Sequence, residues 1–176
     1  MKNLSMSMVL AHADEIVSPT RFQASTLPPR LHEGVRIIHE GVDTARIYPA
    51  PAEPFVVDEQ LTIQPGVPVI THVNRNLEPM RGLHIFARAL PRLQAAIPNA
   101  HVLIIGSAKT RGYGGEAPDG ATWRDTCFAP VQEQLDHSRI HFLGHLPPER
   151  LLAALRLSTA HAYYSYPFVL SWSLTE

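Results

Sequence analysis

Two kinds of apolar pattern alternate along the chain: short continuous runs and stripes at helical spacing. Apolar runs at residues 15–18 and 35–39 predict two short strands, and residues 4–13 predict a short helix before them. Further apolar runs predict four strands in the second part of the chain, at residues 67–73, 101–106, 140–144 and 160–164. The run at 101–106 is nearly continuous, which is typical of a parallel strand covered on both faces.

Helical patterns separate these four strands. The first stripe is made of apolar residues three or four apart, namely Leu83, Phe86, Ala87, Leu90, Leu93 and Ile97. Residues 123–135 predict a second helix, capped by Thr122 and kinked or divided at Pro130, and Pro148 opens a third. Residues 107–121 are glycine-rich and aperiodic, so we expect a loop there. Alternating strands and helices indicate an α/β fold with a parallel sheet, helices on both faces and right-handed crossovers, plus a short N-terminal β/α appendage.

Prolines mark a boundary between two parts of the chain. Residues 49–66 contain Pro49, Pro51, Pro54 and Pro65, a density typical of a linker or a surface crossing between two lobes. We therefore expect residues 1–48 to belong to one lobe, residues 49–66 to be the linker, and residues 67–176 to form a second lobe. The last residues, 171–176, look like the start of a helix that the chain does not complete, so we expect the chain to be a piece of a longer protein.

Composition narrows the classes of function. The formal net charge is −1, which argues against a nucleic-acid partner because phosphate backbones require a broad basic face. Cys127 is the single cysteine, so no intrachain disulfide can form and a reducing compartment fits. No apolar run reaches the roughly 20 residues needed to span a bilayer, and the N-terminus does not read as a signal peptide. We expect a cytoplasmic protein.

The segment between the strand at 67–73 and the helix that follows is the strongest candidate for chemistry. Arg75 and Arg81 flank a proline-containing turn, and Gly82 directly precedes the helix. Anions bind at the carboxyl ends of strands beside helix N-termini, and arginine suits bidentate contacts with phosphate. We predict a diphosphate site with Arg75 and Arg81 as its cations and Gly82 allowing close backbone approach. The alternative is a pair of solvated arginines, one of them paired with Glu78.

Another strand ends at the same edge of the predicted sheet. Gly106 and Ser107 close the strand at 101–106. Ligands of open α/β sheets bind outside the carboxyl ends of the strands, so both residues are candidates for the binding site. A simple strand-to-loop turn remains the alternative.

The ten histidines show no spacing of a metal site. His141 and His145 are four residues apart, which would place them on one face of a helix, but they straddle a strand and a turn. We therefore expect no bound metal.

Several motifs, taken in their order along the chain, resemble the retaining glycosyltransferases of group 1, the family 4 type, whose GT-B fold has two Rossmann-like lobes. Residues 37–43, Ile-Ile-His-Glu-Gly-Val-Asp, are similar to the interlobe I-x-N-G-V-D segment of that family, with Glu40 where Asn is common. Arg75 and Arg81-Gly82 resemble the Arg and Lys-Gly that grip the donor diphosphate, with a spacing one residue longer and Arg in place of Lys. The strands at 101–106 and 140–144 resemble the family's L-x-I-x-G and V-x-F-x-G strands.

The resemblance also implies further site residues. Phe142, Leu143 and His145 fall where the family's backbone meets the donor nucleobase. The family usually carries a Glu, seven residues and a second Glu near the donor sugar. Glu176 matches the second, which contacts the donor ribose, whereas Phe168 stands where the first is expected.

The function implied by the resemblance is a hexosyltransferase-type enzyme. It would move a sugar from a nucleoside-diphosphate sugar to a glycan, lipid-linked or small-molecule acceptor with retention, without a cofactor or metal. Residues 1–48 would be the end of the N-terminal lobe and residues 67–176 most of the nucleotide-binding lobe, so the chain alone is expected to be inactive. Peripheral association with the inner face of the membrane, through the rest of the N-terminal lobe, is a further expectation. The alternatives are a sugar-nucleotide epimerase of similar architecture and a non-catalytic nucleotide-binding or scaffolding lobe.

Overall fold

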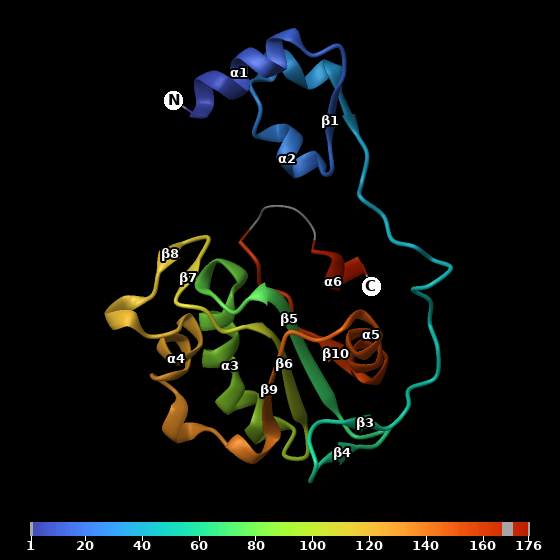
Figure 1. Cartoon of the computed structure of the whole chain (residues 1–176), viewed down its shortest axis with the longest axis vertical. Helices are drawn as coiled ribbons and strands as arrows, with labels where there is room; N and C mark the ends of the chain where they lie inside the picture. The colour runs from blue at the N-terminus through green and yellow to red at the C-terminus, as the bar shows by residue number, and fades with distance from the viewer. Residues whose placement is uncertain (1, 167–170, 176) are drawn as a thin grey trace. The chain divides into compact units, whose positions relative to one another are not determined.

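The alternating strands and helices of the second part build a four-stranded parallel sheet in a computed structural model that describes residues 2–166 and 171–175 (Figure 1). The strand order is β10-β5-β6-β9, and every neighbouring pair is parallel. The strands are β5 (Val69–Asn76), β6 (His101–Ser107), β9 (Ile140–Gly144) and the short edge strand β10 (Ala160–His161). The α/β fold predicted from the apolar runs is confirmed.

Helices cover both faces of this sheet, as predicted (Figure 1). On one face lie α3 (Leu83–Ala96) and α4 (Trp123–Phe128), and on the other lies α5 (Pro148–Leu157). Strand residues with even numbers, such as Ile104, pack in the α3–α4 layer, and residues with odd numbers, such as Leu103, pack in the α5 layer. The two-residue period of a strand produces this division, which is why the strands are apolar on both sides.

The proline-rich segment contains structure that we did not predict. β3 (Phe55–Val56) and β4 (Thr62–Ile63) form an antiparallel pair inside the expected linker at 49–66. Phe55 and Ile63 are buried in the same layer as α5. Strands of two residues are too short to show a hydrophobic period, and the surrounding prolines dominated the sequence pattern.

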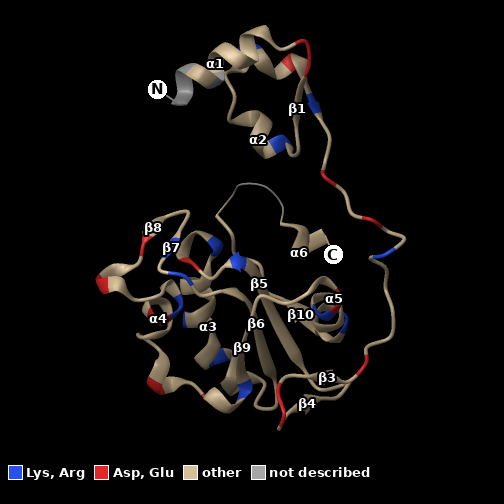
Figure 2. Ribbon diagram, viewed as in Figure 1, with Lys and Arg blue, Asp and Glu red and all other residues tan. Residues whose placement is uncertain are grey.

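The described residues form two compact units. The smaller unit comprises residues 2–42 together with 171–175, and the larger comprises residues 43–166. The proline-rich segment therefore belongs to the larger unit. Basic and acidic residues are interspersed along the ribbon of both units (Figure 2).

The smaller unit contains the predicted N-terminal β/α appendage. Its elements are α1 (Lys2–His12), β1 (Ile16–Ser18), α2 (Arg21–Ser25), a 3-10 helix (Pro29–Gly34), β2 (Val35–Ile37) and α6 (Trp172–Thr175). β1 and β2 pair in parallel. Thr20 caps α2 by accepting the N–H of Gln23 at 3.1 Å.

The region between β6 and β9 differs from the expected loop and long helix. A small hairpin, β7 (Arg111–Gly112) and β8 (Gly115–Glu116), lies within residues 107–121. Thr122 caps α4 by accepting the N–H of Asp125 at 3.1 Å. α4 ends at Phe128, shortly before Pro130, because proline cannot continue the hydrogen-bond ladder of a helix. Three 3-10 turns complete this region, at Pro118–Gly120, Gln132–Gln134 and His137–Arg139.

None of the helices in the described part of the chain is long and apolar enough to cross a membrane.

Candidate functional site

Residues 77–82, called the β5–α3 loop here, connect the carboxyl end of β5 to α3. The N–H of Leu77 donates to the carbonyl of Ser107 at 3.0 Å, which ties the loop to the end of β6. A 3-10 turn follows at Pro79–Arg81. α3 starts directly after Gly82 and has no side-chain cap. The structure therefore brings the predicted loop and a helix N-terminus to the carboxyl edge of the sheet.

Two predicted glycines are required by the backbone at this edge. Gly82 has φ +77° and Gly106 has φ +146°, values that other residues rarely adopt. A Cβ at position 82 would collide with Tyr164, and a Cβ at position 106 would collide with the carbonyl oxygen of Asn74. Both glycines thus allow close packing of neighbouring segments, whereas their contact with a nucleotide stays a prediction.

The two predicted cations differ in their surroundings. Arg75 lies near the end of β5, and its exposed side chain has no hydrogen-bond or ion-pair partner among the described residues. Arg81 is half-buried, and its guanidinium carbon lies 5.3 Å from the centre of the Tyr113 ring. The alternative of an ion pair with Glu78 is not observed in the described part of the chain. Glu78 accepts the backbone N–H of Tyr113 at 2.5 Å instead.

The predicted nucleobase region contains one exposed aromatic side chain. Phe142 is 36% exposed and contacts the Phe128 ring edge-on, with 5.0 Å between the ring centres. The centre of the Phe142 ring lies 5.2 Å from the guanidinium carbon of Arg124. Leu143 packs in the α5 layer, and His145 is exposed. The Leu143 side chain is therefore part of the core, so a base contact there would be left to its backbone.

Two residues of the resemblance lie outside the described residues. Glu176 was expected to contact the donor ribose, and Phe168 was expected to occupy the position of the family's first Glu. Both stay predictions.

A buried polar network in β5 was not found from the sequence. The His72 ring has no exposed surface, stacks on Phe86 with 4.6 Å between ring centres, and hydrogen-bonds the carbonyl of Ala162 through Nδ1 at 2.9 Å. Its Nε2 accepts a hydrogen bond from the Asn74 side chain at 3.0 Å. Burial lowers the pKa of His72 to about 4, although the bond to Ala162 opposes this effect. The sequence did carry a signal for this network: Thr71, His72 and Asn74 are polar residues in a strand that is covered on both faces.

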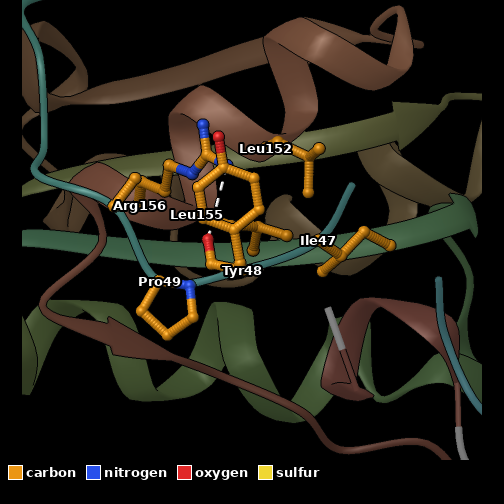
Figure 3. A pocket seen from close by; sticks show the side chains of 7 residues that line it. Ile47, Tyr48, Pro49, Leu152, Leu155 and Arg156 are labelled. Atoms are coloured by element: carbon orange, nitrogen blue, oxygen red, sulfur yellow. Dashed lines mark hydrogen bonds between the residues drawn. The ribbon is translucent and has the colours of Figure 1, made fainter. Parts of the chain in front are cut away.

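A pocket of about 270 Å³ lies between α5 and residues 47–50 (Figure 3). Arg156 donates to the backbone carbonyl of Tyr48 at 3.3 Å, and its guanidinium carbon is 5.1 Å from the centre of the Tyr48 ring. The remaining lining residues are apolar: Ile47, Pro49, Ala50, Leu152 and Leu155. This pocket belongs to the α5 face, whereas the β5–α3 loop leads into the helix on the other face.

Across residues 2–166 and 171–175, no three or more His, Cys, Asp or Glu side chains come together in a way that could hold a metal ion. A metal-free reaction stays an expectation.

Comparisons with known proteins support the resemblance seen in the sequence. Residues 1–47 match the family model described as "Glycosyl transferase family 4 group". A D-inositol 3-phosphate glycosyltransferase from Nocardia farcinica is 26% identical over 171 residues, which cover 94% of this chain and 35% of the relative. The structure of a sucrose-phosphate synthase from Thermosynechococcus elongatus superposes with a TM-score of 0.68 at 21% identity, over 95% of this chain and 39% of the other. The resemblance to group 1 glycosyltransferases with the GT-B fold is confirmed.

Further solved structures share the fold at lower identity. TarM superposes with a TM-score of 0.61 at 10% identity, over 93% of this chain and 27% of TarM. A TarM mutant from S. aureus in complex with fondaparinux, α-GlcNAc-glycerol and UDP has a TM-score of 0.58 at 11% identity, over 88% of this chain and 26% of that chain. The chain spans about a third of the length of the curated relative, at 35%.

Proposed function

We propose that the protein transfers a sugar, of the hexose type, from a nucleoside-diphosphate sugar to a glycan, lipid-linked or small-molecule acceptor with retention of configuration. Arg75 and Arg81 hold the diphosphate in this proposal. The observation that carries it is the pair of arginines at the carboxyl edge, neither of which forms an ion pair within the described residues. The acid in the same loop, Glu78, is engaged by a backbone N–H.

The N-terminus of α3 adds a second source of positive potential. The first N–H groups of a helix have no partner within the helix, and the aligned peptide dipoles place a partial positive charge there. α3 has 14 residues and no side-chain cap. The dipole of this helix favours a bound phosphate at this point, although the N–H of Leu83 already donates to the carbonyl of Glu78 at 3.3 Å.

The arginines would act on the leaving group. Negative charge builds on the diphosphate as the glycosidic bond breaks, and a cation that is already in place stabilises this charge more in the transition state than in the ground state. Loss of one such preorganised group costs on the order of 3 kcal/mol, which is roughly a hundredfold in rate.

The relatives support this donor and acceptor class. The curated relative is a glycosyltransferase that acts on inositol 3-phosphate, and the TarM complex contains UDP. We include no metal or cofactor, and we expect a cytoplasmic location, at the inner face of the membrane.

Titration of the intact protein with UDP, GDP and ADP tests the proposal. We expect saturable binding of at least one diphosphate, weakened by Arg75→Ala and by Arg81→Ala. Arg92→Ala, an exposed arginine farther along α3, is the matched control and should leave binding unchanged. Failure of every nucleoside diphosphate to bind would refute the proposal.

Product analysis separates the alternative enzyme from the transferase. An epimerase releases free nucleotide and an epimerised sugar without any acceptor, whereas the proposed reaction requires an acceptor and preserves the sugar. A nucleotide-binding protein without turnover would indicate the scaffolding lobe.

A further inference from the structure

Glu78 is a buried acid at the edge of the candidate site. Its side chain lies in the β5–α3 loop and is only 1% exposed. A buried carboxylate is costly unless hydrogen-bond donors compensate for the lost water. One oxygen accepts the N–H of Tyr113 at 2.5 Å, while Oε1 is buried without a partner in the described part of the chain. The sequence separation of 35 residues shows that this contact joins two distant loops.

The hairpin β7–β8 is built to admit this contact. A Cβ at Gly112 would collide with the carboxylate of Glu78. The strand β8 is held as well, because the indole N–H of Trp123 donates to the carbonyl of Gly115 at 3.2 Å. Two anchors, one in the turn at Tyr113 and one on β8 at Gly115, therefore fix the position of the hairpin relative to the carboxyl edge.

Tyr113 connects the anchored hairpin to a predicted cation. Its backbone N–H binds Glu78, and its ring lies 5.3 Å from the guanidinium carbon of Arg81. The ring is mostly exposed, at 65%, so a stable position depends on the backbone contact. A guanidinium on the face of an aromatic ring is attracted by the ring's quadrupole and held in orientation.

We infer that Glu78 is a positioning residue of the diphosphate site, acting through the anchored Tyr113 ring on the orientation of Arg81. Glu78 and Arg81 are three residues apart, a spacing at which opposite charges pair in a helical turn. Such a pair would neutralise the cation. Engagement of the Glu78 carboxylate by a backbone N–H leaves the Arg81 guanidinium available to an anion. This inference rests on the proposed function.

Binding measurements with matched variants test the inference. The intact protein and each variant are titrated with UDP, GDP and ADP, and with the corresponding nucleosides, which lack phosphate. We expect Tyr113→Ala to weaken diphosphate binding roughly two- to fivefold, the range of a partly exposed cation–π pair, and to leave nucleoside binding unchanged. In the Arg81→Ala background, Tyr113→Ala should have no further effect, because residues that act as a unit are not additive.

Variants of Glu78 separate positioning from loss of folding. Glu78→Gln keeps an oxygen that accepts the N–H of Tyr113, so it should bind close to the unmodified protein. Glu78→Ala should bind nucleoside diphosphates as weakly as Tyr113→Ala does. Hydrogen exchange of the Tyr113 amide should be faster in Glu78→Ala but not in Glu78→Gln. Tyr48→Ala is the matched control. Tyr48 is also an exposed tyrosine whose ring packs against an arginine, because its ring centre lies 5.1 Å from the guanidinium carbon of Arg156 on the α5 face.

The outcomes distinguish the inference from the proposed function. Suppose that Arg81→Ala weakens diphosphate binding. If Tyr113→Ala then binds normally, or weakens binding further in the Arg81→Ala background, the inference is wrong and the proposed function stands. Unchanged exchange of the Tyr113 amide in Glu78→Ala would also overturn the inference. Absence of binding by the unmodified protein would refute the proposed function and, with it, the role of Glu78.

Discussion

His72 makes the stability of the larger unit sensitive to mild acid. The imidazole is buried, its Nδ1–H donates to the carbonyl of Ala162, and its Nε2 accepts from Asn74. Protonation of Nε2 would place a charge in the core and break the bond from Asn74, because both nitrogens would then be donors. The folded protein therefore requires the neutral ring.

The size of the effect follows from the pKa of His72. Burial lowers this pKa from 6.5 to about 4 in the folded state. Between these two pH values the unfolded chain binds a proton that the folded chain does not, so the free energy of unfolding falls as the pH falls. The contribution of the neutral His72 ring to the free energy of unfolding is fully present above about pH 6.5. It falls by about 2 kcal/mol by pH 5, and by about 3 kcal/mol once His72 is protonated in both the folded and the unfolded state.

Urea unfolding at pH 7, 6 and 5, for the unmodified protein and His72→Gln, measures this effect. The pKa values of His101, His141 and His161 are also lowered by burial, so the difference between the two proteins isolates His72. We expect His72→Gln to be less stable at pH 7, with its deficit about 2 kcal/mol smaller at pH 5. His145→Gln, an exposed site, controls for the loss of an imidazole. A deficit that is the same at all three pH values would refute the reasoning.

Two further predictions concern packing. Phe86→Ala should lower the free energy of unfolding, measured in urea, by about 3–5 kcal/mol, because the Phe86 ring is buried at 2% exposure. Ile85→Ala, at the neighbouring exposed position of α3, should lower it far less. Equal losses in the two variants would contradict the packing. Gly106→Ala should cost more than about 2 kcal/mol, because its φ is positive and its Cβ would collide with Asn74. Gly34→Ala, where a Cβ meets open space, is the control, and a Gly106→Ala protein as stable as this control would contradict the account.

The sheet and its main helices could be predicted because their sequence signals are long and local. The run at 101–106 and the stripe that begins at Leu83 each extend over several residues, so their period is readable. Caps and breakers are also local: Thr122 caps α4 as expected, and α4 ends before Pro130.

The contacts that shape the candidate site could not be predicted, because they join residues far apart in the sequence. The bond between Glu78 and Tyr113 spans 35 residues, and that between His72 and Ala162 spans 90. The sequence left Glu78 as a potential partner of an arginine, since spacing alone does not show which donor reaches a buried carboxylate. Strands of two residues, such as β3 and β7, were missed because they are shorter than any readable period.

The most direct test of the central claim is the contribution of the phosphates to affinity. The intact protein and the double variant Arg75→Ala/Arg81→Ala are each titrated with a nucleoside diphosphate and with its nucleoside. We expect the diphosphate to bind the unmodified protein far more tightly than the nucleoside does, and this advantage to disappear in the double variant. A diphosphate advantage that survives the loss of both arginines would contradict the claim that they hold the leaving group.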